Sequence, residues 1–80
     1  MRLDKYLKVS RLIKRRTVAN EACDADKVTV NGKAARASYD VKVGDIIEIN
    51  MGITPLKVKV MEVVEVVGKD GADRLYQVIQ

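Results

Sequence analysis

The chain has 80 residues, 48% hydrophobic and 32% charged, which is typical of one small globular domain over residues 1–80 and excludes a disordered tail. Its single cysteine, Cys23, excludes an internal disulfide, and without histidine, paired acids or a set of metal ligands we expect no enzyme, no metal and no cofactor. The whole net charge of +4 comes from the first 16 residues, which hold seven bases and one acid, and a charge so localised indicates nucleic acid as the partner.

Residues 2–11 are expected to form a short amphipathic helix. At 100° per residue, Leu3, Tyr6 and Leu7 lie on one side of such a helix and can pack on a core. The opposite arc is basic and remains in water, and it holds Arg2, Lys5, Lys8 and Arg11. Asp4 lies four residues before Lys8 and seven before Arg11, so we expect it to pair with one of them and fix its direction.

A second helix is expected from residue 16 to residue 25. Thr17 and Glu21 make an imperfect version of the Ser/Thr-x-x-Glu capping pattern, so Thr17 is predicted to cap this helix. Lys14, Arg15 and Arg16 then lie at or just before its N-terminus, where the helix dipole disfavours cations. Because free backbone N–H groups and arginines both suit an anion, this N-terminus is predicted to hold a phosphate.

After residue 26 the pattern is typical of a small, mostly antiparallel sheet. Asn31-Gly32 predicts a two-residue hairpin turn, because both residues tolerate positive φ. A bulge or bend is expected at Met61-Glu62, where the alternation changes phase, and a turn at residues 68–71. Lys57 and Lys59 are expected to protect a strand from edge pairing. The predicted strand segments are 27–30, 33–35, 46–49, 56–60, 63–67 and 75–79. The fold class is therefore α+β, with two N-terminal helices packed on the sheet.

Two residues that can carry chemistry also have simpler explanations. Cys23 lies between Ala22 and Asp24 on the second helix, where a small core residue is more common than a redox sensor. Tyr39 lies in a loop and can stack on an unpaired base, yet a tyrosine near a small core usually packs. We therefore expect both residues to serve the fold.

Neither a signal peptide nor a membrane span is predicted. The N-terminal region is charged at about every third residue, and no apolar run approaches the roughly 18–20 residues that cross a bilayer. A basic amphipathic helix can lie on an anionic membrane, but this one offers few bulky apolar groups for insertion. We therefore expect a cytoplasmic location and no membrane partner.

Several short motifs occur in a recognisable order. They are Arg2-Leu3-Asp4-Lys5-Tyr6-Leu7, Arg11, Lys14-Arg15-Arg16-Thr17-Val18-Ala19, Lys27-Val28-Thr29-Val30-Asn31-Gly32-Lys33 and Val43-Gly44-Asp45-Ile46-Ile47. In this order they resemble the RNA-binding domain named after small-subunit ribosomal protein S4, over about residues 1–50, with the strands of residues 51–80 beyond it. The resemblance implies a helix-turn-helix followed by a hairpin. Many members have glycine where this chain has Asp26, so the exit from the second helix is expected to differ.

Within that family, the short chain and its first 17 residues look most like stand-alone members that act in ribosome-associated quality control. The resemblance implies binding to the large ribosomal subunit, to its ribosomal RNA and to the peptidyl-tRNA that a stalled subunit still carries. It further implies cooperation with the tail-elongating factor RqcH, which adds alanine to the nascent chain.

The predicted function is non-enzymatic recognition of structured RNA by its shape and phosphate positions, because the A-form major groove is too narrow for side chains. Basic residues would contact phosphates, Asp4 and Lys5 would orient them, and Asp4 can also accept a hydrogen bond from a 2′-hydroxyl. The predicted RNA-binding residues are Arg2, Asp4, Lys5, Lys8, Arg11, Lys14, Arg15, Arg16, Thr17, Asn31 and Lys33. Two alternatives remain open: a basic protein-interaction module, and a ribosome-biogenesis factor or general RNA chaperone.

Overall fold

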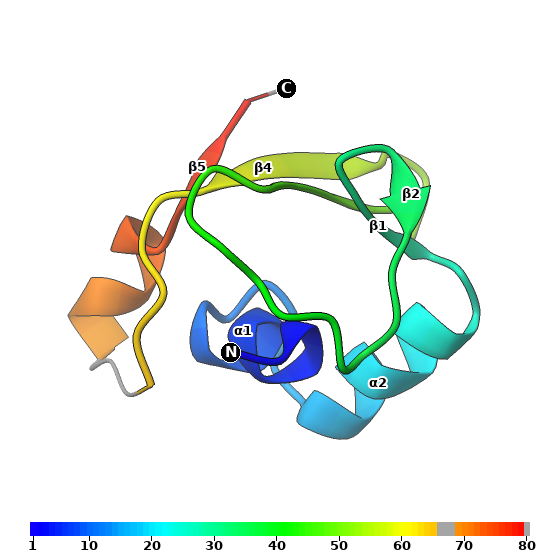
Figure 1. Ribbon diagram of the computed structural model, residues 1–80, viewed down its shortest axis with the longest axis horizontal. Coiled ribbons are helices and arrows are strands. Elements are labelled where there is room, and N and C mark those ends of the chain that lie inside the picture. The colour runs from blue at the N-terminus through cyan, green and yellow to red at the C-terminus, as the bar shows by residue number, and fades with distance from the viewer. Residues whose placement is uncertain (66–68, 80) are drawn as a thin grey trace.

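In the computed structural model, which describes residues 1–65 and 69–79, two helices lie against one face of a five-stranded sheet (Figure 1). The helices are α1 (Leu3–Val9) and α2 (Arg16–Asp24). In sheet order, the strands are β2 (Lys33–Ala34), β1 (Val28–Val30), β3 (Ile46–Ile49), β4 (Leu56–Val60) and β5 (Tyr76–Val78). A 3-10 helix, η1 (Lys69–Arg74), precedes β5. All these strands pair antiparallel, so the predicted α+β class is confirmed.

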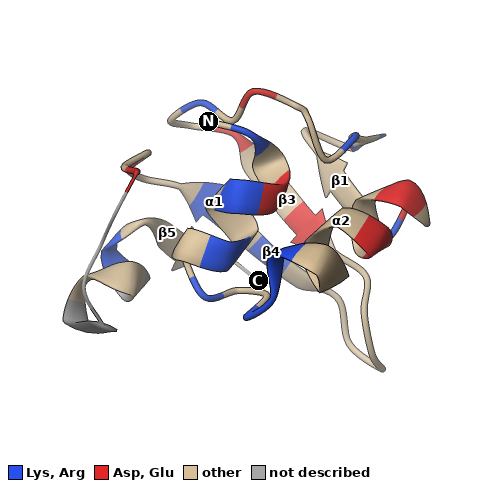
Figure 2. Ribbon diagram, turned by 90° about the horizontal axis from the view of Figure 1, so that it is seen from below, with Lys and Arg blue, Asp and Glu red and all other residues tan. Residues whose placement is uncertain are grey.

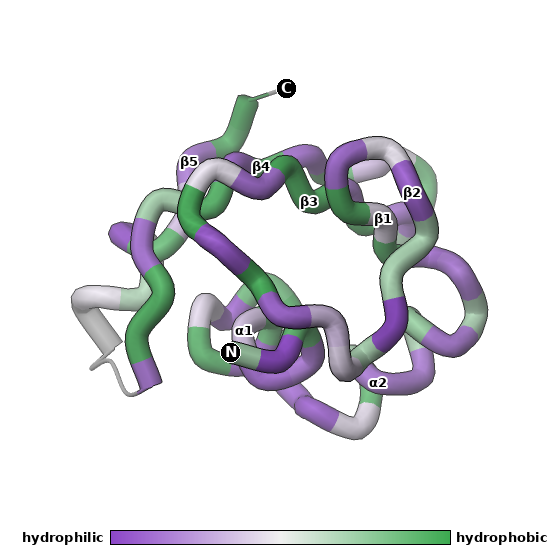
Figure 3. The backbone as a smooth tube through the Cα atoms, viewed as in Figure 1, coloured by the Kyte–Doolittle hydropathy of each residue, from purple (hydrophilic) through white to green (hydrophobic). Residues whose placement is uncertain are grey.

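The core lies between α1 and the sheet. Leu3, Tyr6 and Leu7 of α1 are fully buried, as are Ile47 and Val58 on the facing side of the sheet. Hydrophobic and hydrophilic residues alternate along β4, as Figure 3 shows, so that only one face of the strand enters the core. Each large buried side chain contributes roughly 1.5–3 kcal/mol. Packing of this kind stabilises α1, because a seven-residue helix is unstable on its own.

The hairpin between β1 and β2 turns at Asn31-Gly32, as predicted. The φ angles of these two residues are +53° and +85°, the left-handed region that asparagine and glycine tolerate best. Asn31 also connects the hairpin to β3, since its Oδ1 accepts from the Ile46 N–H at 3.0 Å and its Nδ2 donates to Asp45 Oδ1 at 3.1 Å. Both ends of the Asn31 amide therefore serve the fold.

The carbonyl oxygen of Leu75 joins three parts of the chain. It accepts a hydrogen bond from the buried Tyr6 hydroxyl at 2.6 Å, and burial raises the pKa of that hydroxyl. The same oxygen accepts from the backbone N–H groups of Met61 and Glu62, at 2.8 and 3.2 Å. The segment that follows β4 is consequently attached to α1 through one buried contact.

Cys23 and Tyr39 both serve the fold, as predicted. Cys23 is 3% exposed in the core, and burial raises the pKa of its thiol to about 11. Tyr39 packs against the core cluster, and its hydroxyl donates to Asp45 Oδ2 at 2.9 Å. Neither residue therefore presents a free reactive group.

Three predictions about the C-terminal half are wrong. Residues 63 and 64 form no strand, and residues 66–67 lie outside the described part of the chain. The bulge expected at Met61-Glu62 is present, because both N–H groups donate to the Leu75 carbonyl, which lies opposite Met61 in the register of β4 and β5. Residues 69–71 begin η1 instead of a turn, while Gly68 is also outside the described part. The lysines of β4 protect no edge, because β4 lies between β3 and β5.

The chain leaves α2 through the left-handed backbone conformation that glycine usually adopts, although Asp26 stands there and a different conformation was expected. Asp26 has φ +58°, so it adopts the left-handed conformation itself. The Asp26 N–H donates to the Cys23 carbonyl at 3.1 Å, and the Lys27 N–H donates to the Ala22 carbonyl at 2.9 Å. This pair of bonds is a Schellman motif, so the change from glycine to aspartate leaves the chain direction unaltered.

Candidate nucleic-acid interface

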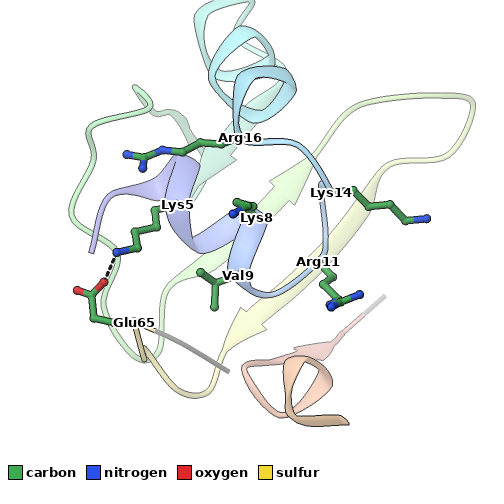
Figure 4. A pocket seen from close by; sticks show the side chains of 7 residues that line it. All are labelled: Lys5, Lys8, Val9, Arg11, Lys14, Arg16 and Glu65. Carbon is green, nitrogen blue, oxygen red and sulfur yellow. Dashed lines mark hydrogen bonds and ion pairs between the residues drawn. The ribbon is translucent and has the colours of Figure 1, made fainter. Parts of the chain in front are cut away.

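A basic groove lies between α1, the loop after it and the start of α2 (Figure 4). Its volume is about 580 Å³, and five of its seven lining side chains are cationic. Figure 2 shows Lys and Arg gathered over α1 and the loop that leads into α2, while acids lie toward the end of α2. The residues that define this basic groove are Lys5, Lys8, Val9, Arg11, Lys14, Arg16 and Glu65.

The predicted RNA-binding residues do not all lie in the basic groove. Arg2 and Arg15 are exposed but do not line it. Thr17 lines a separate hollow with Asp4, Asn20 and others, and it does not cap α2. The N-cap is Arg15, whose side chain makes no capping bond. The helix begins at Arg16, two residues before the start that a cap at Thr17 would give.

Asp4 is the centre that orients two of the cations. Its side chain is 3% exposed, and its Oδ1 accepts from Arg2 Nε at 3.2 Å and from the Lys5 N–H at 2.8 Å. Its Oδ2 faces Arg16 Nε at 3.3 Å and Asn20 Nδ2 at 3.4 Å. The prediction that Asp4 orients a cation is correct, but the cations are Arg2 and Arg16 instead of the helical neighbours that its spacing indicated.

The Asp4 carboxylate is charged and already satisfied. Burial on its own raises its pKa, but the hydrogen bonds from Arg2, Arg16, Asn20 and the Lys5 N–H together hold the pKa below its usual range. Both oxygens are engaged inside the protein, and the side chain is 3% exposed. The contact from Asp4 to RNA stays a prediction, and the position of Asp4 suits the orientation of Arg2 and Arg16.

Arg11 enters the basic groove from a strained backbone position. It follows Ser10, the C-cap of α1, and has φ +64°, a conformation that costs an L-residue about 1 kcal/mol relative to glycine. Its N–H donates to the Lys8 carbonyl at 3.0 Å, which closes the helix. Helices commonly place glycine at this position, so an arginine there is better explained by its side chain than by the fold.

Replacing Arg11 with glycine is expected to stabilise the protein while weakening its RNA binding. Relief of the positive φ should raise the free energy of unfolding by about 1 kcal/mol. Loss of one charge-assisted phosphate contact should weaken binding roughly tenfold. Thermal denaturation and fluorescence anisotropy with a short RNA hairpin measure the two effects. Arg11→Ala is the control, because it loses the side chain but keeps the strain, and unchanged affinity in both variants would remove Arg11 from the interface.

The hairpin residues of the predicted site lie apart from the basic groove. Asn31 and Lys33 line a second hollow of about 690 Å³, beside Arg36, Ser38 and Tyr39. Figure 1 shows the β1–β2 hairpin at the opposite side of the molecule from the loop that joins α1 to α2. A contact of the hairpin with RNA stays a prediction that is separate from the groove.

Sequence reasoning missed one charged residue of the basic groove. Glu65 lines it and forms an ion pair with Lys5, which is 60 positions earlier in the chain. No local pattern relates the two residues, so no sequence signal was available to find the contact. Separately, within residues 1–65 and 69–79 no helix is long and apolar enough to span a membrane.

Comparison with known proteins agrees with the geometry. Residues 1–47 match the S4 domain family. A relative from Streptococcus pneumoniae is 52% identical over 99% of this chain and 90% of its own length, and one from Halalkalibacterium halodurans is 51% identical over 98% and 89%. Both are named RQC P-site tRNA stabilizing factor.

Solved structures support the same assignment. Heat Shock Protein 15 of Vibrio cholerae, described as trimeric, superposes with a TM-score of 0.92 at 29% identity, over 99% of this chain and 81% of that one. The solution structure of HP1423 gives 0.84 at 28% identity, over 100% and 98%. The chain therefore belongs to the S4 domain family, and within it to the group of the RQC P-site tRNA stabilizing factors.

Proposed function

We propose that this protein binds structured RNA on the large ribosomal subunit and stabilises a tRNA there, without catalysing a reaction. The name that its relatives carry supports the tRNA part, since they are 45–52% identical over nearly the whole chain. The match of residues 1–47 to the S4 domain supports an RNA-binding surface that includes the two helices. The chain would act by holding RNA in position, as a cationic element between two RNA surfaces.

The basic groove is the observation that carries this proposal. Its five cations come from three consecutive elements, α1, the following loop and α2, and they surround one hollow with a single acid among the described lining residues. Arginine and lysine are the residues that bind phosphate, arginine often with two hydrogen bonds. Because Asp4 holds Arg16 from within, at least one cation is oriented before RNA arrives. A preorganised set of this kind loses little side-chain entropy on binding.

The expected partners are the RNA of a stalled large ribosomal subunit and one protein factor that acts on it. We propose ribosomal RNA of the large subunit and peptidyl-tRNA as the two RNA partners, and RqcH as the protein partner. In this scheme the chain keeps the peptidyl-tRNA in the P site while RqcH adds alanine to the stalled nascent chain. The support is the identity to factors named for ribosome-associated quality control and P-site tRNA. If RNA is the direct ligand, association with the subunit should disappear after complete RNA digestion, whereas a protein-interaction module would survive it.

Affinity for RNA is expected to fall steeply with salt. If the basic groove engages four to six phosphates, the slope of log K against log salt concentration should be roughly −3 to −5. Fluorescence anisotropy with an RNA hairpin at several salt concentrations measures this slope. The Arg11→Gly variant should lower its magnitude by about one. A slope near zero would contradict phosphate binding in the groove.

A further inference from the structure

The segment after β4 brings an acid into the basic groove, although it lies outside the residues that match the S4 family. Glu65 forms an ion pair with Lys5, and Figure 4 shows the two side chains meeting at the edge of the groove. Buried contacts position the segment: Val63 packs against the core cluster, and the Leu75 carbonyl holds the N–H groups of Met61 and Glu62. Glu65 therefore reaches the groove because of how the fold is built.

An acid at this place opposes the binding of phosphate. Its charge neutralises Lys5, and it repels any polyanion that enters the groove. The hydrogen bond from Lys5 lowers the pKa of Glu65, so the carboxylate is ionised at neutral pH. In a site built only to attract phosphates, such a residue weakens binding of every nucleic acid equally.

The 2′-hydroxyl of ribose can compensate for the repulsion between Glu65 and phosphate, and only RNA has this group. The RNA backbone carries a hydrogen-bond donor that DNA lacks, the 2′-hydroxyl, and A-form RNA displays it in a wide and shallow groove. Glu65 Oε2 contacts Lys5, while Oε1 has no hydrogen-bond partner within the described residues, and the side chain is 69% exposed. Asp4, the other acid near these cations, is buried and fully engaged. Glu65 is thus the carboxylate of the groove that a 2′-hydroxyl can reach.

We propose that Glu65 is a specificity-determining residue of the basic groove, which accepts a hydrogen bond from a ribose 2′-hydroxyl and repels polyanions that lack one. This inference rests on the proposed function, since it requires RNA in the groove. In this proposal the segment after β4, which lies outside the residues that match the S4 family, makes the groove select RNA over nucleic acids without a 2′-hydroxyl.

The test compares one short RNA hairpin with its 2′-fluoro analogue, which keeps the A-form shape but has no 2′ donor. Dissociation constants are measured by fluorescence anisotropy for the wild type and for Glu65→Ala, Glu65→Gln and Glu62→Ala. Glu62 is exposed on the same segment and does not line the groove, so Glu62→Ala changes the net charge equally. The wild-type preference for RNA over the 2′-fluoro analogue should fall about tenfold in Glu65→Ala, the effect of one charge-assisted hydrogen bond.

The controls separate this inference from the proposed function. Glu62→Ala should keep the wild-type preference, and Glu65→Gln should lie between, because glutamine retains an acceptor without the charge. An unchanged preference in Glu65→Ala, with both ligands bound more tightly, would overturn the inference and leave Glu65 as a counter-ion for Lys5. If charge reversal at Lys8 and Lys14 leaves RNA affinity unchanged, the proposed function fails as well.

Discussion

Reversing Lys8 and Lys14 together, as Lys8→Glu/Lys14→Glu, is expected to abolish co-sedimentation with large ribosomal subunits without unfolding the protein. Both side chains line the basic groove and are exposed, and neither forms an ion pair with a side chain that the structure describes, which leaves aside residues 66–70, 73 and 80. A charge-assisted hydrogen bond contributes roughly 1.5–3 kcal/mol. Losing two such bonds and adding repulsion should reduce affinity by at least about 100-fold. Sedimentation through a sucrose cushion measures binding, and circular dichroism with thermal melting measures folding.

The matched control for this variant is Lys27→Glu/Lys42→Glu. These two lysines are exposed and outside the groove, and both double variants lower the net charge from +4 to zero. If position matters more than total charge, the control should still co-sediment. Arg16 is a less suitable site for reversal, because its Nε faces Asp4 at 3.3 Å and a glutamate there would place two acids together. Co-sedimentation that persists in Lys8→Glu/Lys14→Glu would contradict the proposed interface.

Asp4→Asn is expected to cause the largest loss of stability, about 2 kcal/mol at neutral pH. The substitution removes the charge that Arg2 and Arg16 contact, and it replaces one acceptor oxygen with an amide N–H donor that faces other donors. Since folding lowers the pKa of Asp4, its contribution is complete above the carboxyl's ordinary pKa and is lost as pH falls through the lower, folded value. The difference between wild type and variant should therefore be constant near neutral pH and narrow below about pH 4. Urea denaturation at a series of pH values measures it.

Asp24→Asn serves as the comparison for Asp4→Asn. Asp24 is an exposed acid of α2, and the described part of the chain gives it no ion pair. We expect its replacement to change stability by less than about 0.5 kcal/mol at neutral pH. A constant difference between wild type and Asp4→Asn down to pH 2 would show that the hydrogen bonds of Asp4 do not depend on its ionisation.

The elements that depend on local spacing were predictable from the sequence. The apolar stripe of α1 and the Asn31-Gly32 turn lie where periodicity and turn chemistry placed them. Element ends were less predictable. α1 ends at Val9, before the predicted residue 11, where Arg11 adopts a positive φ and its N–H bonds to the Lys8 carbonyl. The change of phase after β4 indicated the bulge at Met61-Glu62, but its partner, Leu75, lies far along the chain, and no local pattern identifies that partner.

The candidate site divides in the same way. The cationic character of the first 16 residues is a property of composition, and five of the residues predicted from it to bind RNA line one groove. The partners of Asp4 were predicted wrongly, since helical spacing indicated Lys8 or Arg11, whereas the packing of α2 against α1 brings Arg16 to the carboxylate. Thr17 was misassigned as a cap because α2 begins at Arg16.

The sequence by itself determined the fold class, the place of the positive charge and the kind of ligand it suits, because these follow from composition and from spacing within a few residues. Only the tertiary structure decided which acids meet which cations. Asp4 orients Arg2 and Arg16 because its buried position between the two helices surrounds its carboxylate with hydrogen-bond donors. Glu65 became part of the groove because the Leu75 carbonyl attaches its segment to α1, across 60 residues of chain. Contacts at that separation arise from packing, and packing is a property of the folded chain as a whole.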